Sequence, residues 1–137
     1  MIPLSLYIHF PWCIQKCPYC DFNSHTNNEA LYKPYMETLI DDVTEILPYI
    51  WGRRIHSIFI GGGTPSLMPP PLLESFFTQL RALLGFDPNI EITMEANPGT
   101  VDSSYFQAYR EIGVNRLSIG VQSLNDLQLE KIGRIHS

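Results

Sequence analysis

The three cysteines of the chain lie in one short stretch, CIQKCPYC, at positions Cys13, Cys17 and Cys20. A disulfide would pair two of these thiols and leave the third alone. A structural zinc ion would need a fourth ligand, for which His9 and His25 are the nearby candidates. Cysteines that serve only as small buried apolar groups fit poorly with a segment that also holds a glutamine, a lysine and a proline.

An iron–sulfur cluster uses three thiolates without this difficulty. A 4Fe–4S cluster has four irons, so three cysteine ligands leave one iron without a protein ligand. A small molecule can bind at such an open position, as it does at the open position of a catalytic zinc. The spacing therefore favours a cluster with a bound small molecule, and zinc is the main alternative.

The composition narrows the class of protein. The chain has 137 residues, of which 45% are hydrophobic, enough for one domain with a core. A formal net charge of -5, without a cluster of Lys and Arg, argues against nucleic acid and anionic membranes as partners. No stretch approaches the roughly 20 apolar residues of a transmembrane segment, and the N-terminus lacks the basic start of a signal peptide. We therefore expect a cytoplasmic protein with reduced thiols.

Runs rich in β-branched and aromatic residues alternate with segments of helical periodicity. The expected strands are 4–10, 55–60, 89–95 and 114–121, and the expected helices lie in 31–47, 70–85 and 101–113, with a fourth from about Asn125 to Gly133. This alternation predicts βαβ units and a parallel sheet. A closed eight-stranded barrel needs roughly 250 residues, so we expect an open sheet or the first part of a longer protein.

Local signals set the expected limits and faces of the helices. Pro34 should lie in the first turn of the first helix, Pro48 should end that helix, and Gly113 should end the third. The apolar face of the first helix should carry Leu31, Tyr35, Leu39, Val43 and Ile46. The face of the second should carry Leu72, Phe76, Leu80 and Leu83 or Leu84.

Unusual residues follow each expected strand at its carboxyl end, where parallel α/β folds bind ligands. The first strand leads into the cysteines, the second into GGGTP (61–65), the third ends at Glu95, and the fourth leads to Gln122. Taken singly, these features and Arg134 have ordinary explanations, such as a tight turn or a surface cation. Together they could hold a ligand with an amine, a carboxylate and hydroxyls.

Five blocks of sequence carry a resemblance to a known family. The cysteine segment, with Tyr19 before its last cysteine, resembles the cluster loop of radical S-adenosylmethionine (SAM) proteins. The blocks YIHFPWCIQKCPYCDFNSH, IFIGGGTPSL, EITMEANPGT, GVNRLSIGVQS and IGRIH together resemble the oxygen-independent coproporphyrinogen III oxidase group, and specifically its heme-chaperone branch. The resemblance runs from about Leu4 to the last residue.

The resemblance implies a fold and a set of site residues. The family fold is a partial (β/α)6 TIM-like barrel, so 1–137 would be the N-terminal part of the radical SAM core domain with its first four strands. Cys13, Cys17 and Cys20 match the cluster ligands. The positions that match SAM contacts are Tyr7, Tyr19, Gly62, Gly63, Thr64, Glu95, Gln122 and Arg134. The implied chemistry is chelation of the open iron by SAM and its reductive cleavage to a 5'-deoxyadenosyl radical.

Two departures from the oxidase pattern favour the heme-chaperone branch. Phe22 stands where the oxidase has a further cysteine, and the chain begins shortly before Tyr7, whereas the oxidase has an N-terminal extension. The branch implies heme, heme-acceptor proteins and an electron donor as partners, with the heme-binding segment expected beyond residue 137. None of His9, His25, His56 and His136 matches that segment, and we expect them to be structural, to lie behind the site or to face solvent.

Two other functions remain as alternatives. One is an enzyme, coproporphyrinogen III oxidase (a dehydrogenase) or another radical SAM oxidoreductase. The other is a zinc-stabilised binding module. If the remaining strands of the barrel are absent, we also expect an exposed sheet edge and exposed apolar helix faces.

Overall fold

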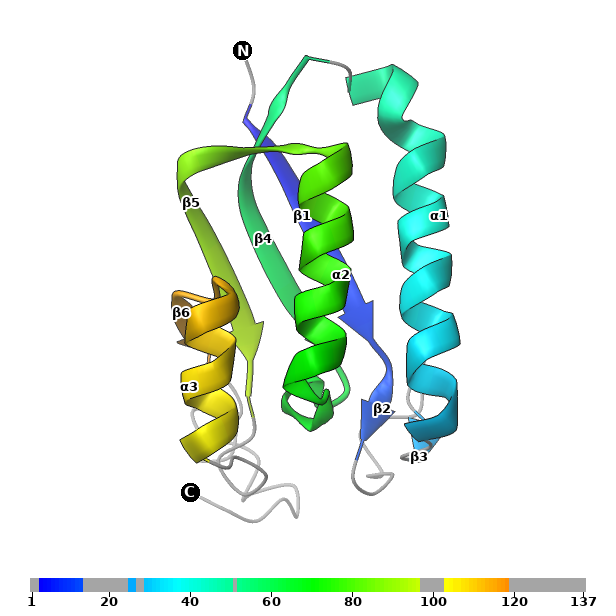
Figure 1. Ribbon diagram of the computed structural model, residues 1–137, viewed down its shortest axis with the longest axis vertical. Helices are drawn as coiled ribbons and strands as arrows, with labels where there is room; N and C mark the ends of the chain where they lie inside the picture. Colours follow the sequence, from blue (N-terminus) through cyan, green and yellow to red (C-terminus); the bar gives the residue numbers. More distant parts are fainter. Residues whose placement is uncertain (1–2, 14–24, 27–28, 51, 97–102, 119–137) are drawn as a thin grey trace, which may run out of the picture.

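A computed structural model describes the chain over residues 3–13, 25–26, 29–50, 52–96 and 103–118. Strands and helices alternate along these residues (Figure 1). In chain order the elements are β1 (Leu4–Phe10), β2 (Trp12–Cys13), β3 (His25–Thr26), the 3-10 turn η1 (Glu29–Leu31), α1 (Tyr32–Ile50), β4 (Arg54–Gly62), the 3-10 turn η2 (Pro65–Leu67), α2 (Pro70–Leu83), β5 (Gly85–Glu95), α3 (Ser103–Ile112) and β6 (Arg116–Ser118).

The main sheet has four parallel strands in the order β1-β4-β5-β6. Each strand pairs with the strand of this sheet that comes next in the chain, and a helix lies between the two in sequence. The carboxyl ends of the strands therefore lie on one edge of the sheet, at the bottom of Figure 1. The expected class, parallel βα repeats that form the first four strands, is confirmed.

One face of the sheet carries the core. Alternate residues of a strand point to the same face, and those of β1, β4 and β5 that pack under the helices are apolar and buried. They are Ile8, Phe10, Ile58, Ile60, Ile92 and Met94. They belong to one hydrophobic cluster with residues of all three helices, among them Met36, Phe77 and Tyr109. The helices thus cover this face and fix the positions of the strands.

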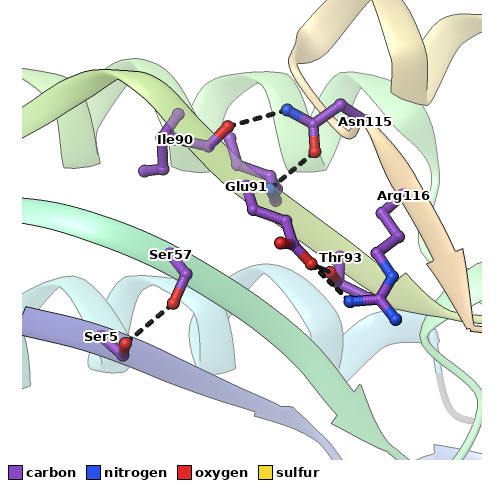
Figure 2. Close-up of polar contacts among 8 residues, drawn as sticks. Ser5, Ser57, Ile90, Glu91, Thr93, Asn115 and Arg116 are labelled. Carbon is purple, nitrogen blue, oxygen red and sulfur yellow. Dashed lines mark hydrogen bonds and ion pairs between the residues drawn. The ribbon is translucent and has the colours of Figure 1, made fainter.

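The opposite face of the sheet is largely polar. Figure 2 views it with the helices behind the strands and with Ser5, Ser57, Glu91, Thr93 and Arg116 on the near side. The hydroxyls of Ser5 and Ser57 lie 2.8 Å apart, and Arg116 Nη1 donates to Glu91 Oε1 at 2.5 Å. Parallel sheets are usually apolar on both faces because helices cover both. This polar face therefore suits the interior of an incomplete barrel better than a second packed core.

The side chain of Asn115 joins β5 to the start of β6 (Figure 2). Its Oδ1 accepts a hydrogen bond from the N–H of Ile92 at 2.8 Å, and its Nδ2 donates to the carbonyl of Ile90 at 2.8 Å. Its backbone N–H donates to the carbonyl of Ile92 at 2.9 Å. The amide side chain therefore acts as the partner of β5 just before β6 begins.

Replacing Asn115 with alanine should lower the free energy of unfolding by about 1–2 kcal/mol, because two backbone groups of β5 lose this partner. Urea denaturation followed by circular dichroism measures the change. Asn89→Ala is the matched control, since the structure gives the Asn89 side chain no hydrogen bond among the described residues. Equal losses in the two variants would contradict this role for Asn115.

The first helix differs from expectation at its end and on its apolar face. Pro34 lies in its first turn as predicted, but α1 continues through Pro48 to Ile50. A proline this close to the end removes only its own N–H from the helix, and Gly52, with φ 80°, is better suited to stop it. The predicted face is wrong at its two ends.

Leu31 and Ile46 are 50% and 42% exposed, respectively. The reason for the first is that Leu31 belongs to the turn η1 and precedes the helix. The buried side chains of α1 are those of Tyr32, Met36 and Val43. The core-facing stripe is therefore rotated from the predicted one.

The remaining elements agree with expectation apart from their limits. Helix α2 buries Phe76 and Leu80 as predicted, together with Leu73 and Phe77. Strand β5 begins at Gly85, ahead of the predicted start at 89, because Gly85 and Phe86 already pair with Arg54 and Ile55 of β4, before the pairing shifts register. The third helix ends before Gly113 as predicted. The fourth predicted helix and the end of the last predicted strand lie outside the described residues. None of the helices in the described part is long and apolar enough to cross a membrane.

Candidate functional site

The glycine segment, residues 61–64 at the end of β4, is hydrogen-bonded to the residues just before and at the start of the cysteine segment. The N–H of Gly63 donates to the carbonyl of Phe10 at 2.8 Å, and the N–H of Thr64 donates to the carbonyl of Trp12 at 2.7 Å. Trp12 and Cys13 form β2, whose backbone pairs with His25 and Thr26 of β3. The structure thus places the start of the cysteine segment beside the glycine segment.

Aromatic rings hold the backbone on this side of the site. The ring of Trp12 lies 4.9 Å from that of Tyr32 and 5.0 Å from that of Tyr35, and 5.1 Å from that of Phe10. The hydroxyl of Tyr35 donates to the carbonyl of His9 at 2.5 Å. Helix α1 therefore fixes the end of β1 through both packing and a hydrogen bond.

Glu95 reaches the same place from the end of β5. Its Oε1 accepts a hydrogen bond from the N–H of Gly62 at 3.1 Å. Glu91, four residues earlier on the strand, pairs with Arg116, which lowers its pKa by hydrogen bonding and by its positive charge. Among the described residues Glu95 has no cationic partner. Glu95 therefore lies beside the glycine segment, where the N–H of Gly62 is its hydrogen-bond partner among the described residues.

Tyr7 completes this group of residues from β1. A Cβ atom placed on Gly61 would lie 3.1 Å from the Tyr7 hydroxyl and 3.2 Å from Glu95 Oε1, so both groups border that glycine. Partial burial, and then the negative charge of Glu95, raise the pKa of the Tyr7 phenol. The hydroxyl therefore stays protonated at neutral pH and can donate a hydrogen bond.

The site also contains His9, which the sequence suggests only as a possible zinc ligand or as one of four histidines that could lie behind the site. Its Nδ1 lies 3.1 Å from the Tyr7 hydroxyl, and its ring lies 3.0 Å from the Cβ position of Gly62. Its Nε2 is buried and has no hydrogen-bond partner in the described part of the chain. The sequence could have indicated this, because His9 follows Tyr7 by two residues on the same strand, and such residues share a face.

The predicted site residues divide into two groups. The structure brings together Tyr7, Gly62, Gly63, Thr64 and Glu95, and it places the backbone of Cys13 beside them. Five others lie outside the described residues, namely Cys17, Tyr19, Cys20, Gln122 and Arg134. Within the described ranges, no three residues of the metal-binding types come together.

The described residues fit SAM as a ligand. Gly62 is exposed and has φ 120°, and a Cβ on it would lie 2.6 Å from the carbonyl oxygen of Phe10. Only glycine fits this position, and its exposed backbone carries no side chain that would stand between it and a ligand. The Glu95 carboxylate suits the methionyl ammonium, and the three thiols of the cysteine segment suit an iron–sulfur cluster.

Comparison with known proteins identifies the family of the chain. The sequence profile of the Radical SAM superfamily matches residues 7–137. The chain therefore belongs to the radical SAM superfamily. Among its relatives is the heme chaperone HemW of Escherichia coli, 52% identical over 135 residues, which cover 98% of this chain and 36% of that protein.

Other relatives point to the same group. The heme chaperone HemW of Haemophilus influenzae is 48% identical, over 98% of this chain and 37% of its own. The solved structure of coproporphyrinogen III oxidase (HemN) from Escherichia coli, described as a radical SAM enzyme, matches with a TM-score of 0.80 and 29% identity, over 98% of this chain and 31% of that one. The chain thus spans little more than a third of the length of the HemW relatives.

Proposed function

We propose that residues 1–137 are the N-terminal part of the core domain of a radical SAM heme chaperone, a cytoplasmic protein that binds heme and transfers it to acceptor proteins. Cys13, Cys17 and Cys20 would hold a 4Fe–4S cluster. The residues that would contact SAM are Tyr7, Tyr19, Gly62, Gly63, Thr64, Glu95, Gln122 and Arg134. When bound, the cluster and SAM supply one-electron reductive chemistry, for which the protein needs an electron donor.

One observation carries the proposal. The Glu95 carboxylate has no cationic partner among the described residues, and it accepts a hydrogen bond from the N–H of Gly62. The segment that contains Gly62 is hydrogen-bonded to the backbone just before Cys13. An acceptor for an ammonium group therefore lies near the first of the three cysteines. The role of this chain's residues is to bind and orient SAM. The heme-chaperone role draws its support from the HemW relatives.

Replacing Glu95 with glutamine should weaken SAM binding by at least tenfold, because a charge-assisted hydrogen bond to the ammonium loses its charge. Glutamine keeps an oxygen for the N–H of Gly62, so the loop should hold its place. Glu91→Gln is the matched control on the same strand, and we expect it to leave the affinity unchanged. Equilibrium dialysis of the intact, anaerobically reconstituted protein measures the affinity.

Three results would count against the proposal. Equal SAM affinity in the Glu95→Gln variant and the native protein would remove Glu95 from the site. One zinc ion per chain, without iron or sulfide, would favour a zinc-stabilised binding module. Cluster assembly without heme binding would remove the chaperone role.

The second candidate is coproporphyrinogen III oxidase, favoured by the structural similarity to HemN. Oxidative decarboxylation of coproporphyrinogen III by the intact protein would establish this activity. The chaperone proposal predicts no turnover in that assay and predicts instead transfer of bound heme to an acceptor protein.

A further inference from the structure

A buried turn follows the glycine segment and continues the same backbone. Thr64, Ser66 and Met68 are 7%, 3% and 0% exposed, respectively. Within the turn, the N–H of Leu67 donates to the carbonyl of Thr64 at 3.0 Å, and the N–H of Met68 donates to that of Pro65 at 3.0 Å. The carbonyls of Ser66 and Met68 accept neither of these two hydrogen bonds, and buried carbonyls need hydrogen-bond donors.

Tyr109 of α3 supplies that partner. Its hydroxyl donates toward the carbonyl of Met68 at 2.5 Å and lies 3.2 Å from the carbonyl of Ser66. The side chain is fully buried, and burial first, then neighbouring Tyr105 and Tyr32, raise its pKa. The phenol therefore remains protonated over the working pH range, so it keeps its hydrogen to donate to this turn.

The glycine segment and the turn form one stretch of backbone, which is held by hydrogen bonds at both of its ends. The carbonyls of Phe10 and Trp12 fix the segment at Gly63 and Thr64, and Tyr109 fixes it at Ser66 and Met68. Only Pro65 lies between Thr64 and Ser66. A shift of the turn would therefore move the backbone at Thr64, one of the proposed SAM contacts.

We propose that Tyr109 is a positioning residue for the SAM site. Its hydroxyl holds the turn and, through it, the Gly62–Thr64 backbone in the arrangement that binds SAM. This inference rests on the proposed function, since it requires that SAM binds at the glycine segment. Tyr109 itself does not touch the ligand and acts only through the backbone it holds.

The test compares SAM affinity in two variants of α3, using the intact reconstituted protein. Tyr109→Phe removes one hydroxyl and should raise the Kd for SAM by about fivefold or more, because the buried carbonyl of Met68 loses the hydrogen bond that ties the turn to α3. Tyr105→Phe removes a hydroxyl one turn away that makes no hydrogen bond to the described residues. The ring of Tyr105 lies 6.0 Å from that of Tyr109. This control should keep the native Kd. Iron content and cluster absorbance without SAM should be native in both variants.

A rescue separates positioning from a general effect on the fold. 4-Aminophenylalanine at position 109 keeps a donor at the ring tip and should restore the Kd to within about twofold of native. If Tyr109→Phe yields no soluble protein, 4-fluorophenylalanine replaces it, because fluorine fills space without donating a hydrogen bond. We expect this variant to fold and to bind SAM as weakly as predicted for phenylalanine.

The outcomes distinguish the inference from the function on which it rests. Failure of the native protein to bind SAM would overturn the proposed function. Native SAM binding together with an unchanged Kd in Tyr109→Phe, an equal loss in Tyr105→Phe, or no rescue by the amino group would overturn only the role of Tyr109. Failure of the 4-fluorophenylalanine variant to fold would overturn it too, because the hydroxyl would then support the fold as a whole.

Discussion

Replacing Cys17 with serine should abolish assembly of the cluster, with iron falling from about four atoms per chain to near zero after anaerobic reconstitution. A serine hydroxyl is a poor iron ligand at neutral pH because, unlike a thiol, it does not ionise readily. Cys13 and Cys20 alone would leave two of the four irons without protein ligands. SAM binding should be lost with the cluster, since the iron that SAM would chelate is gone.

The adjacent Lys16→Ala variant is the matched control for this experiment. It changes the same segment but removes no thiol, so iron and sulfide contents should stay native. Iron and sulfide analysis, together with visible absorbance, reads out both variants. A full iron complement in Cys17→Ser would show that Cys17 is not a ligand, and loss of iron in both variants would show only that the segment is sensitive to change.

Replacing Gly62 with alanine should damage both the fold and the proposed SAM site. Its φ of 120° is strained for any residue with a side chain, and the new Cβ would lie 2.6 Å from a backbone oxygen of Phe10, which cannot move aside cheaply. We expect the free energy of unfolding to fall by about 3 kcal/mol or more. SAM binding should be lost, because the hydrogen bonds of Gly62 and Gly63 would be displaced.

Two other glycines separate strain from damage to the site. Gly113 has φ 137°, but a Cβ on it would meet the far end of the flexible Arg81 side chain at 2.7 Å. Gly113→Ala should therefore lower stability by about 1–3 kcal/mol and leave SAM affinity native. A Cβ on Gly85 would meet only Arg54 Cγ, at 3.5 Å, so Gly85→Ala should change neither. Chemical denaturation and equilibrium dialysis measure the two quantities. Native SAM affinity in Gly62→Ala would remove this glycine from the site.

The strands and their shared edge could be predicted from the sequence because one face of the sheet is apolar. Ile58, Ile60, Ile92 and Met94 recur at every second position and end in residues that break the pattern. Gly113 could be identified as a helix stop because its positive φ is a local property of glycine. These predictions depend only on neighbours in sequence, so they can be made without knowing how the helices pack on the sheet.

The features that could not be predicted depend on partners distant in sequence. The register shift that lengthens β5 arises from its pairing with β4. The sequence predicts that Tyr109 lies in a helix. Its contact with the turn after β4 depends on how α3 packs against that turn. The place of His9 in the site depends on the pairing of β1 with β4, which brings Gly62 against its ring.

The fastening of Gly63 and Thr64 to Phe10 and Trp12 has a consequence for the order of assembly. Strand β1 pairs with β4, which follows the whole of α1 in the chain. The cysteines are therefore synthesised well before the backbone that supports them. A nascent chain must extend past Thr64 before these two hydrogen bonds can form. If the cluster binds only to the assembled arrangement, its binding free energy adds to that of the sheet. Cluster insertion and closure of the sheet would then be one cooperative event during biogenesis.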